Sequence, residues 1–298
     1  MISVLVPTYN YKVGQLITAI HHQLSNLTIP FEIICMEDGS DPESIEANAS
    51  IQELSNTHHL ISEDNHGRLE TRILLCNHAK HEWILFLDAD TSPKSDEFIK
   101  NYLNAISDST EAIFGGFAYY QTPPEHDFLL RWRYGRKFEA RPAIIRNKKP
   151  YKVIISANFL IKKSVFESLD LKKHNGLYGY DSYFGGQLKS HNVNVVHIDN
   201  EVFHLGLEPN LIYLNKKEQA AQTLLFLHNN HYMDQHDNGL LKVFRLLKSI
   251  GMNHLVGAIF RGIRNKLTRN LIGTNPSIYL LQFYKIGYLC YIDKYGIN

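Results

Sequence analysis

The stretch WILFLDADT, residues 83–91, is the part of the sequence from which the fold can be worked out. Its first five residues are all apolar, which is typical of a strand buried on both faces of a sheet. The run ends at Asp88 and Asp90, two carboxylates one residue apart. Ligands of open α/β sheets lie beyond the carboxyl ends of the strands, where paired carboxylates suit a divalent cation and a phosphorylated ligand. The same residues also suit a turn or a helix cap, so this stretch alone leaves both interpretations open.

Two earlier segments repeat the pattern of an apolar run followed by polar residues. The run ISVLV at 2–6 continues into PTYN at 7–10, and FEIICM at 31–36 continues into EDGS at 37–40. Apolar residues recur at helical spacing from Val13 to Leu24, which predicts an amphipathic helix between the two strands. Strands that alternate with helices over roughly the first 100 residues are typical of a parallel, doubly wound sheet.

The three polar clusters are predicted to meet. Right-handed crossovers put the carboxyl ends of parallel strands on the same edge of a sheet. We therefore expect residues 8–10, 37–40 and 88–90 to converge on one cleft. This convergence favours the metal site over the turn at Asp88 and Asp90.

The composition is that of an ordinary globular protein. The chain has 298 residues, of which 44% are hydrophobic and 20% charged, with a formal net charge of +1. Three cysteines are too few and too scattered for a disulfide framework or a zinc site. No apolar run approaches the roughly 18 residues of a membrane span, and no signal peptide is recognisable at the start. We expect a cytoplasmic protein.

The second half of the chain is predicted to hold further strands and then helices. Strands are expected over 112–120, 151–156 and 193–198, with a basic, aromatic loop between the first two. The resulting domain prediction is a catalytic domain over 1–206, divided near residue 120, and a helical region over 207–298.

The last sixty residues are strongly basic. From Asn238 to Asn298 there are nine Lys and Arg residues and one acid, Asp293. Apolar stripes interleave with these cations, which is typical of an amphipathic helix. Packing on the catalytic domain, a homodimer and peripheral contact with the inner face of a membrane are all compatible with 240–298, and packing or a dimer is favoured.

Five motifs in a fixed order carry a family resemblance. They are VLVPTYN at 4–10, EDGS at 37–40, Asn65-x-Gly67 with Arg72 downstream, Asp88-Ala89-Asp90, and Tyr180-Asp181 before Phe184-Gly185. With these motifs the chain resembles the inverting glycosyltransferases of family 2, over about residues 1–206. The resemblance implies a GT-A fold, which is a Rossmann-like, mostly parallel central sheet flanked by helices, here with a helical C-terminal extension.

The resemblance also implies a role for each motif. Asp88 would contact the ribose and Asp90 would bind Mn²⁺ or Mg²⁺ on the diphosphate. Asp181 would be the catalytic base, although many members have two consecutive acids where this chain has Tyr180-Asp181. His204 is either a third metal ligand or a packed histidine. The remaining nucleotide-binding residues would be Pro7, Thr8, Tyr9, Asn10, Glu37, Asp38, Asn65, Gly67 and Arg72.

The implied reaction is metal-dependent transfer of a sugar, with a UDP-sugar as the expected donor. The expected acceptor is a saccharide or lipid-linked saccharide of a bacterial cell-surface polysaccharide. The alternatives are a catalytically inactive sugar-nucleotide-binding or scaffold subunit and, less favoured, a nucleotidyltransferase. A glycine-rich phosphate loop would support the last, and PTYN is a poor one. No nucleic-acid-binding module is recognisable.

Overall fold

The computed structural model describes residues 1–171, 178–232 and 238–297. The chain divides into two compact units, and we describe each by itself. The sheet unit comprises Met1–Ala118, Glu139–Gly176 and His191–Gly206, and the helical unit comprises Tyr119–Phe138, Leu177–Ser190 and Leu207–Asn298. Residues 119–138 and 177–190, which we assigned to the catalytic domain, group with the helical unit.

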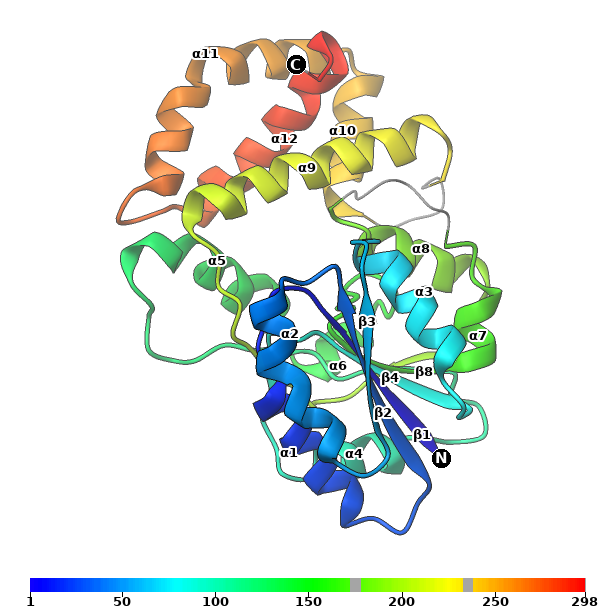
Figure 1. Ribbon diagram of the computed structural model, residues 1–298. Helices are drawn as coiled ribbons and strands as arrows, with labels where there is room; N and C mark the ends of the chain where they lie inside the picture. The colour runs from blue at the N-terminus through cyan, green and yellow to red at the C-terminus, as the bar shows by residue number, and fades with distance from the viewer. Residues whose placement is uncertain (172–177, 233–237, 298) are drawn as a thin grey trace. The chain divides into compact units, whose positions relative to one another are not determined.

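A seven-stranded sheet forms the centre of the sheet unit (Figure 1). Its order is β3-β2-β1-β4-β8-β6-β9, and β8 is antiparallel to both of its neighbours while the other pairs are parallel. The prediction of a mostly parallel central sheet is confirmed. The strands are β1 (Ile2–Thr8), β2 (Phe31–Asp38), β3 (Thr57–Ser62), β4 (Trp83–Leu87), β6 (Ala112–Phe114), β8 (Asn158–Lys162) and β9 (Val195–His197).

Strand β4, which precedes Asp88 and Asp90, lies inside this sheet. All five residues of β4 are buried, as expected for a strand between β1 and β8 with helices over both faces. Figure 1 shows α1, α2 and α4 on one side of the sheet and α3 and α7 on the other. The helices of the sheet unit are α1 (Gly14–Ser25), α2 (Pro42–Asn48), a 3₁₀ turn (Ala49–Glu53), α3 (Arg68–His78), α4 (Phe98–Asn104), α6 (Ala143–Arg146) and α7 (Lys163–Ser168).

A second, three-stranded sheet lies at the carboxyl end of β4. It consists of β5 (Thr91–Pro93), β10 (Val202–His204) and β7 (Phe117–Ala118), in the order β5-β10-β7. Strand β10 is antiparallel to β5, with His204 opposite Thr91. The segment that follows the Asp-Ala-Asp motif is therefore paired with a segment more than a hundred residues later.

Two predicted strands of the sheet unit were wrong in extent or kind. The strand expected over 112–120 is broken at Gly115 and Gly116, where Gly116 has φ +90° and a Cβ on Gly115 would lie 2.3 Å from the Asn200 carbonyl oxygen. The strand expected over 151–156 does not form. Its apolar residues Ile154 and Ile155 are instead buried in a loop.

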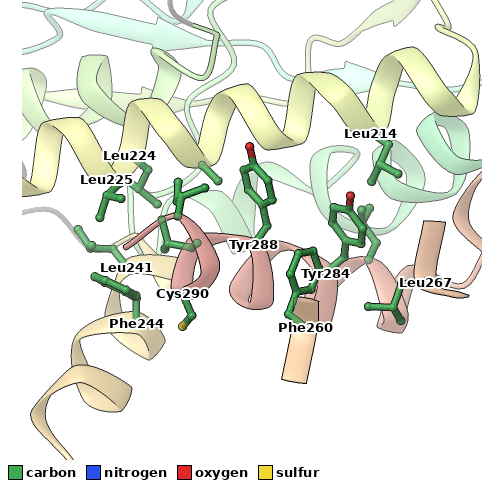
Figure 2. Close-up of a cluster of buried hydrophobic side chains, with 14 of the residues drawn as sticks. Leu214, Leu224, Leu225, Leu241, Phe244, Phe260, Leu267, Tyr284, Tyr288 and Cys290 are labelled. Atoms are coloured by element: carbon green, nitrogen blue, oxygen red, sulfur yellow. The ribbon is translucent and has the colours of Figure 1, made fainter. Parts of the chain in front are cut away.

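The helical unit has an apolar core of its own (Figure 2). Phe244, Phe260, Tyr284 and Tyr288 are buried in it, with the ring centroids of Phe260 and Tyr284 5.0 Å apart. Leu241, Phe244 and Phe260 of the apolar stripes in the basic C-terminal segment thus pack within this unit. None of the helices in the described ranges is long and apolar enough to cross a membrane. The helices are a 3₁₀ turn (His126–Phe128), α5 (Leu129–Tyr134), a π-helical turn (Gly135–Glu139), α8 (Asp181–Ser190), α9 (Asn210–Asn229), α10 (Gly239–Ser249), α11 (Asn253–Ile272) and α12 (Ile278–Tyr295).

Candidate active site

The ends of β1 and β2 are tied together by their polar residues. Thr8 pairs with Glu37 in the parallel register, so the two strands end side by side. The Asn10 amide donates to Ser40 Oγ (3.0 Å), and the Asp41 amide donates to Asn10 Oδ1 (2.8 Å). Strand β4 pairs with β1 in the same direction. The three strand ends therefore lie on one edge of the sheet, as predicted.

The residues of the first motif differ in their exposure. The Tyr9 side chain is exposed, and Asn10 adopts a left-handed conformation with φ +47°. The Thr8 side chain is buried and lies 3.3 Å from Cys35 Sγ. Tyr9 and Asn10 are therefore the members of this motif that are accessible to a ligand.

Asp38 organises the loop before α3. Its Oδ1 accepts a hydrogen bond from the His66 amide (2.8 Å) and its Oδ2 accepts one from the Gly67 amide (2.9 Å). Gly39 has φ +71°, and a Cβ there would lie 2.7 Å from the Asn65 nitrogen. Such a close approach requires glycine. Asp38, Asn65 and Gly67, which the sequence assigned to one nucleotide pocket, are thus in one cluster.

Glu37 is a buried member of a hydrogen-bond network. Its carboxylate accepts from Ser40 Oγ (2.6 Å), Asn48 Nδ2 (2.8 Å) and His59 Nε2 (3.1 Å). Burial raises the pKa of Glu37, but these three hydrogen bonds outweigh it and hold the pKa below its ordinary value. Glu37 positions Ser40, and through Ser40 it positions Asn10.

Cys35 extends this buried network. Ligand atoms of Cys35, Glu37 and His59 lie within 4.8 Å of one another, which is a spacing that a metal ion can accept. Burial raises the pKa of the Cys35 thiol to about 12, so the thiol is neutral at pH 7. Glu37 accepts hydrogen bonds from Ser40, Asn48 and His59, so in this structure the cluster is a hydrogen-bond network.

Asp88 lies between two arginines of α3. One carboxylate oxygen is paired with Arg72 Nη2 and the other with Arg68 Nη2. Burial raises the pKa of Asp88, whereas Arg68, Arg72 and His204 lower it, and the net effect is a lowered pKa. Two cations for one carboxylate leave this part of the site positively charged, which suits an anionic ligand.

Arg68 is the site residue that the sequence analysis missed. It precedes Arg72 by four residues on α3, a spacing that puts both side chains on the same face of the helix. The Arg72 side chain is 7% exposed and that of Arg68 is 66% exposed. Arg68 is therefore the more accessible of the two cations.

Asp90 and His204 come together across the three-stranded sheet. Asp90 Oδ2 lies 3.6 Å from His204 Nε2, and the Leu205 amide donates to the Asp90 carbonyl oxygen (2.8 Å). Carboxylate and imidazole ligands lie about 2.0–2.2 Å from a bound divalent metal, so two ligands of one ion are about 3 to 3.6 Å apart. The separation of Asp90 and His204 fits a single divalent cation.

Gly206 completes the surroundings of Asp90. A Cβ on Gly206 would lie 2.0 Å from Asp90 Oδ2, so this position accepts glycine alone without moving the carboxylate. In Gly206→Ala we expect the affinity for Mn²⁺, measured by calorimetry in the presence of UDP, to fall about 10- to 100-fold. Gly14→Ala is the matched control, because a Cβ there meets no described atom within 4 Å. Equal Mn²⁺ affinity in the two variants would contradict the assignment of Asp90.

Asp181 belongs to the other unit. It is the first residue of α8 in the helical unit, and it is exposed. The next residue, Ser182, accepts a hydrogen bond from Asn238 Nδ2 (3.1 Å). Asp38, Asp88, Asp90 and His204 all lie in the sheet unit.

Several solved structures are similar to this chain over most of its length. The mannosyltransferase PcManGT from Pyrobaculum calidifontis, in complex with GDP-Man and Mn²⁺, is 14% identical with a TM-score of 0.56, covering 100% of this chain and 88% of that chain. TarS 1-349 from S. aureus is 18% identical with a TM-score of 0.51, covering 99% and 90%. Glucosyl-3-phosphoglycerate synthase from Mycobacterium tuberculosis, with Mn²⁺, UDP and glucosyl-3-phosphoglycerate, is 14% identical with a TM-score of 0.52, covering 75% and 78%.

At these identities the solved structures show the fold, and it is the one predicted. Among curated proteins no sequence matches this chain. The family is shown by the sequence. The sequence model of the family described as glycosyl transferase family 2 matches residues 3–170, which is more than half of the chain. The residues of the strand ends described above fall within this match. The chain belongs to glycosyl transferase family 2 and is a glycosyltransferase.

Proposed function

We propose that this enzyme transfers a sugar from a nucleotide-sugar donor to an acceptor hydroxyl, with inversion at the anomeric carbon and with the help of a divalent cation. The observation that carries the proposal is the 3.6 Å separation of Asp90 Oδ2 and His204 Nε2. Asp90 lies two residues from Asp88, whose carboxylate is paired with Arg68 and Arg72. A cation site next to a positively charged site suits a diphosphate.

Asp90 and His204 would hold the cation, either Mn²⁺ or Mg²⁺. When bound, such a cation acts as a Lewis acid that stabilises negative charge on the departing diphosphate. Arg68 and Arg72 would add fixed positive charge that needs no reorganisation during the reaction. The fold likeness to proteins solved with GDP-Man or UDP together with Mn²⁺ supports this choice of donor class and metal.

The nucleoside would lie on the edge formed by β1, β2 and the loop before α3. Tyr9 and Asn10 are accessible there, and Asp38 holds the loop of Asn65 and Gly67 in place. We assign the ribose to Asp88 and the base to the side of Asp38. A UDP-sugar is the donor we would test first.

Asp181 would be the general base. An acceptor hydroxyl is a poor nucleophile until a carboxylate takes its proton. Asp181 is exposed and lies on a segment separate from the carboxylates of the donor site. With one carboxylate for the metal and another for the proton, the sugar would pass directly from donor to acceptor, and a single displacement inverts the anomeric carbon. The proposed acceptor is a saccharide or lipid-linked saccharide of a cell-surface polysaccharide.

Proton NMR of the product tests this function. The enzyme is incubated with a panel of nucleotide sugars and saccharide acceptors, with Mn²⁺ or with EDTA. We expect one donor to give a glycoside of inverted anomeric configuration, and only with the metal present. A product with retained configuration would contradict the single displacement. Transfer of the nucleotidyl group, with release of a sugar 1-phosphate, would instead identify a nucleotidyltransferase.

His204→Ala tests the second metal ligand. Loss of one imidazole ligand is expected to raise the half-saturating Mn²⁺ concentration for transfer about 10- to 100-fold. Turnover at saturating Mn²⁺ should fall less. His254→Ala is the matched control, because His254 is exposed and lies on α11 of the helical unit. If His204→Ala has an unchanged metal requirement, His204 is a packing residue.

A further inference from the structure

An exposed apolar ridge runs along α10 and α11 of the helical unit. Its residues recur at helical spacing on each helix and continue through the turn between them. Exposed apolar side chains are common when scattered, but a contiguous row of large ones marks an interaction surface. The hairpin ridge consists of Val243 (48% exposed), Leu246 (62%), Ile250 (61%), Met252 (40%), Leu255 (52%) and Ile259 (48%).

The hairpin ridge is not needed for the core of the unit. The same helices turn other residues to the core, and Leu241, Phe244, Phe260, Leu267 and Leu271 are buried there. On α10, Val243 and Leu246 lie on the side of the helix away from this buried face. The two helices therefore carry apolar residues on both sides, and only one side is covered.

The turn between the helices is itself apolar. It reads Ile250-Gly251-Met252, and Gly251 has φ +72°. The turn is held by hydrogen bonds from the Gly251 amide to the Lys248 carbonyl (3.2 Å) and from the Met252 amide to the Leu247 carbonyl (2.8 Å). Loops at a protein surface are usually polar. The exposed side chains of Ile250 and Met252, on a turn that is fixed by hydrogen bonds, therefore indicate an apolar partner.

The charge around the hairpin ridge identifies that partner. Helices α10 and α11 contain seven Lys and Arg residues and no acid. Lys248 is paired with Asp293 (3.0 Å) and Arg264 with Glu218 (2.8 Å), both acids from other helices. Arg261, Lys266 and Arg269 of α11 are exposed, and neither helix carries an acid, so an anionic partner is favoured.

A second copy of the chain would be a poor partner. A two-fold dimer brings the same patch of each copy together, so the cations of α10 and α11 would face their own counterparts. An anionic lipid surface satisfies both features at once. It takes up apolar side chains at the boundary of headgroups and acyl chains, and it attracts the cations that flank them.

We propose that the hairpin ridge is a docking surface for an anionic lipid bilayer, with the Ile250-Gly251-Met252 turn inserted into the interface. This proposal concerns the helical unit and does not depend on the donor site. The exposed side of α10 and α11 would thus contact the bilayer, while the buried side packs in the core of the unit.

Vesicle flotation with the full chain tests the proposal. The wild type is expected to float with vesicles of phosphatidylcholine and phosphatidylglycerol at low salt, and not with phosphatidylcholine alone. In the double variant I250E/L255E, the fraction of protein bound to vesicles should be at least about tenfold lower than in the wild type. A second variant, K266E/R269E, keeps the apolar ridge, and it should bind anionic vesicles more weakly than the wild type.

Leu211→Glu is the matched control. Leu211 is 51% exposed on α9 of the same unit, so the change introduces one glutamate at a comparable apolar position outside the ridge. We expect this variant to float like the wild type, and all variants to keep the wild-type unfolding temperature. A wild type that does not float, or an I250E/L255E variant that floats equally well, would overturn the proposal. A wild-type dimer that I250E/L255E splits, without vesicle binding, would assign the ridge to a second copy and overturn it as well.

Discussion

Asp90→Asn is expected to lower the rate of sugar transfer by at least about 1000-fold. Asparagine keeps the size of the side chain but removes the negative charge that a divalent cation needs, and loss of charge stabilisation on a leaving group costs about this much. The side chain of Asp90 is 31% exposed, so the fold should tolerate the change. The measurements are the initial rate of transfer at saturating Mn²⁺ and the unfolding temperature.

Asp108→Asn provides the comparison for this result. Asp108 is an exposed acid of the same unit, and its substitution removes the same charge at a position outside the site. We expect it to transfer sugar at the wild-type rate. If Asp90→Asn also retained that rate, the cation would have to be held elsewhere, and the assignment of the three-stranded sheet to metal binding would fail.

Asp181→Asn is expected to lower transfer by about 10²- to 10⁴-fold while leaving donor binding unchanged. The amide cannot accept the proton of the acceptor hydroxyl, and general base catalysis typically contributes a factor of this size. The affinity for nucleoside diphosphate should stay the same, because Asp181 lies in the helical unit and the proposed donor ligands lie in the sheet unit. Transfer assays and calorimetric titration with UDP and Mn²⁺ measure the two quantities separately.

Ser182→Ala controls for disturbance of the helix start. Ser182 follows Asp181 in the first turn of α8 and accepts a hydrogen bond from Asn238. This variant should keep most of its activity. If Asp181→Asn lost donor affinity in proportion to its rate, the carboxylate would belong to donor binding. The base would then have to be sought at another position.

The central sheet was predictable because its signals are local. The five buried residues of β4 follow one another in sequence, and the polar ends of β1 and β2 follow apolar runs of the same kind. The crossover rule then places all three ends on one edge without any knowledge of side-chain positions. The antiparallel strand β8 carries no comparable signal, because its apolar run reads the same in either direction.

The details of the site depended on contacts between distant residues. The proximity of His204 to Asp90 comes from the pairing of β10 with β5, two strands of three residues each, which are too short to be recognised as partners. Arg68 was missed because its pairing with Asp88 is visible only when α3 is placed against the end of β4. Glu37 was expected to bind the nucleotide, yet it is buried and enclosed by Ser40, Asn48 and His59.

The division of the chain into two units also depends on contacts between residues that are far apart in sequence. The sequence predicts a basic loop over 121–150, but residues 121–138 of it belong to the helical unit. Trp132 Nε1 donates to the Tyr120 carbonyl (3.0 Å), and the Arg136 guanidinium lies 4.8 Å from the centre of the Trp132 ring. The cations of this segment are thus packed against aromatic rings, an arrangement for which the charge pattern gave no signal.

A metal site at Asp90 and His204 can be tested by a thermal unfolding series with nucleoside diphosphates, each measured with Mn²⁺ and with EDTA. A ligand that binds only the folded state raises the unfolding temperature, so the shift reports binding. We predict that one nucleoside diphosphate stabilises the wild type only when Mn²⁺ is present, and that Asp90→Asn abolishes this shift. A shift of equal size in EDTA, or the same Mn²⁺-dependent shift in Asp90→Asn, would contradict a metal site at Asp90 and His204.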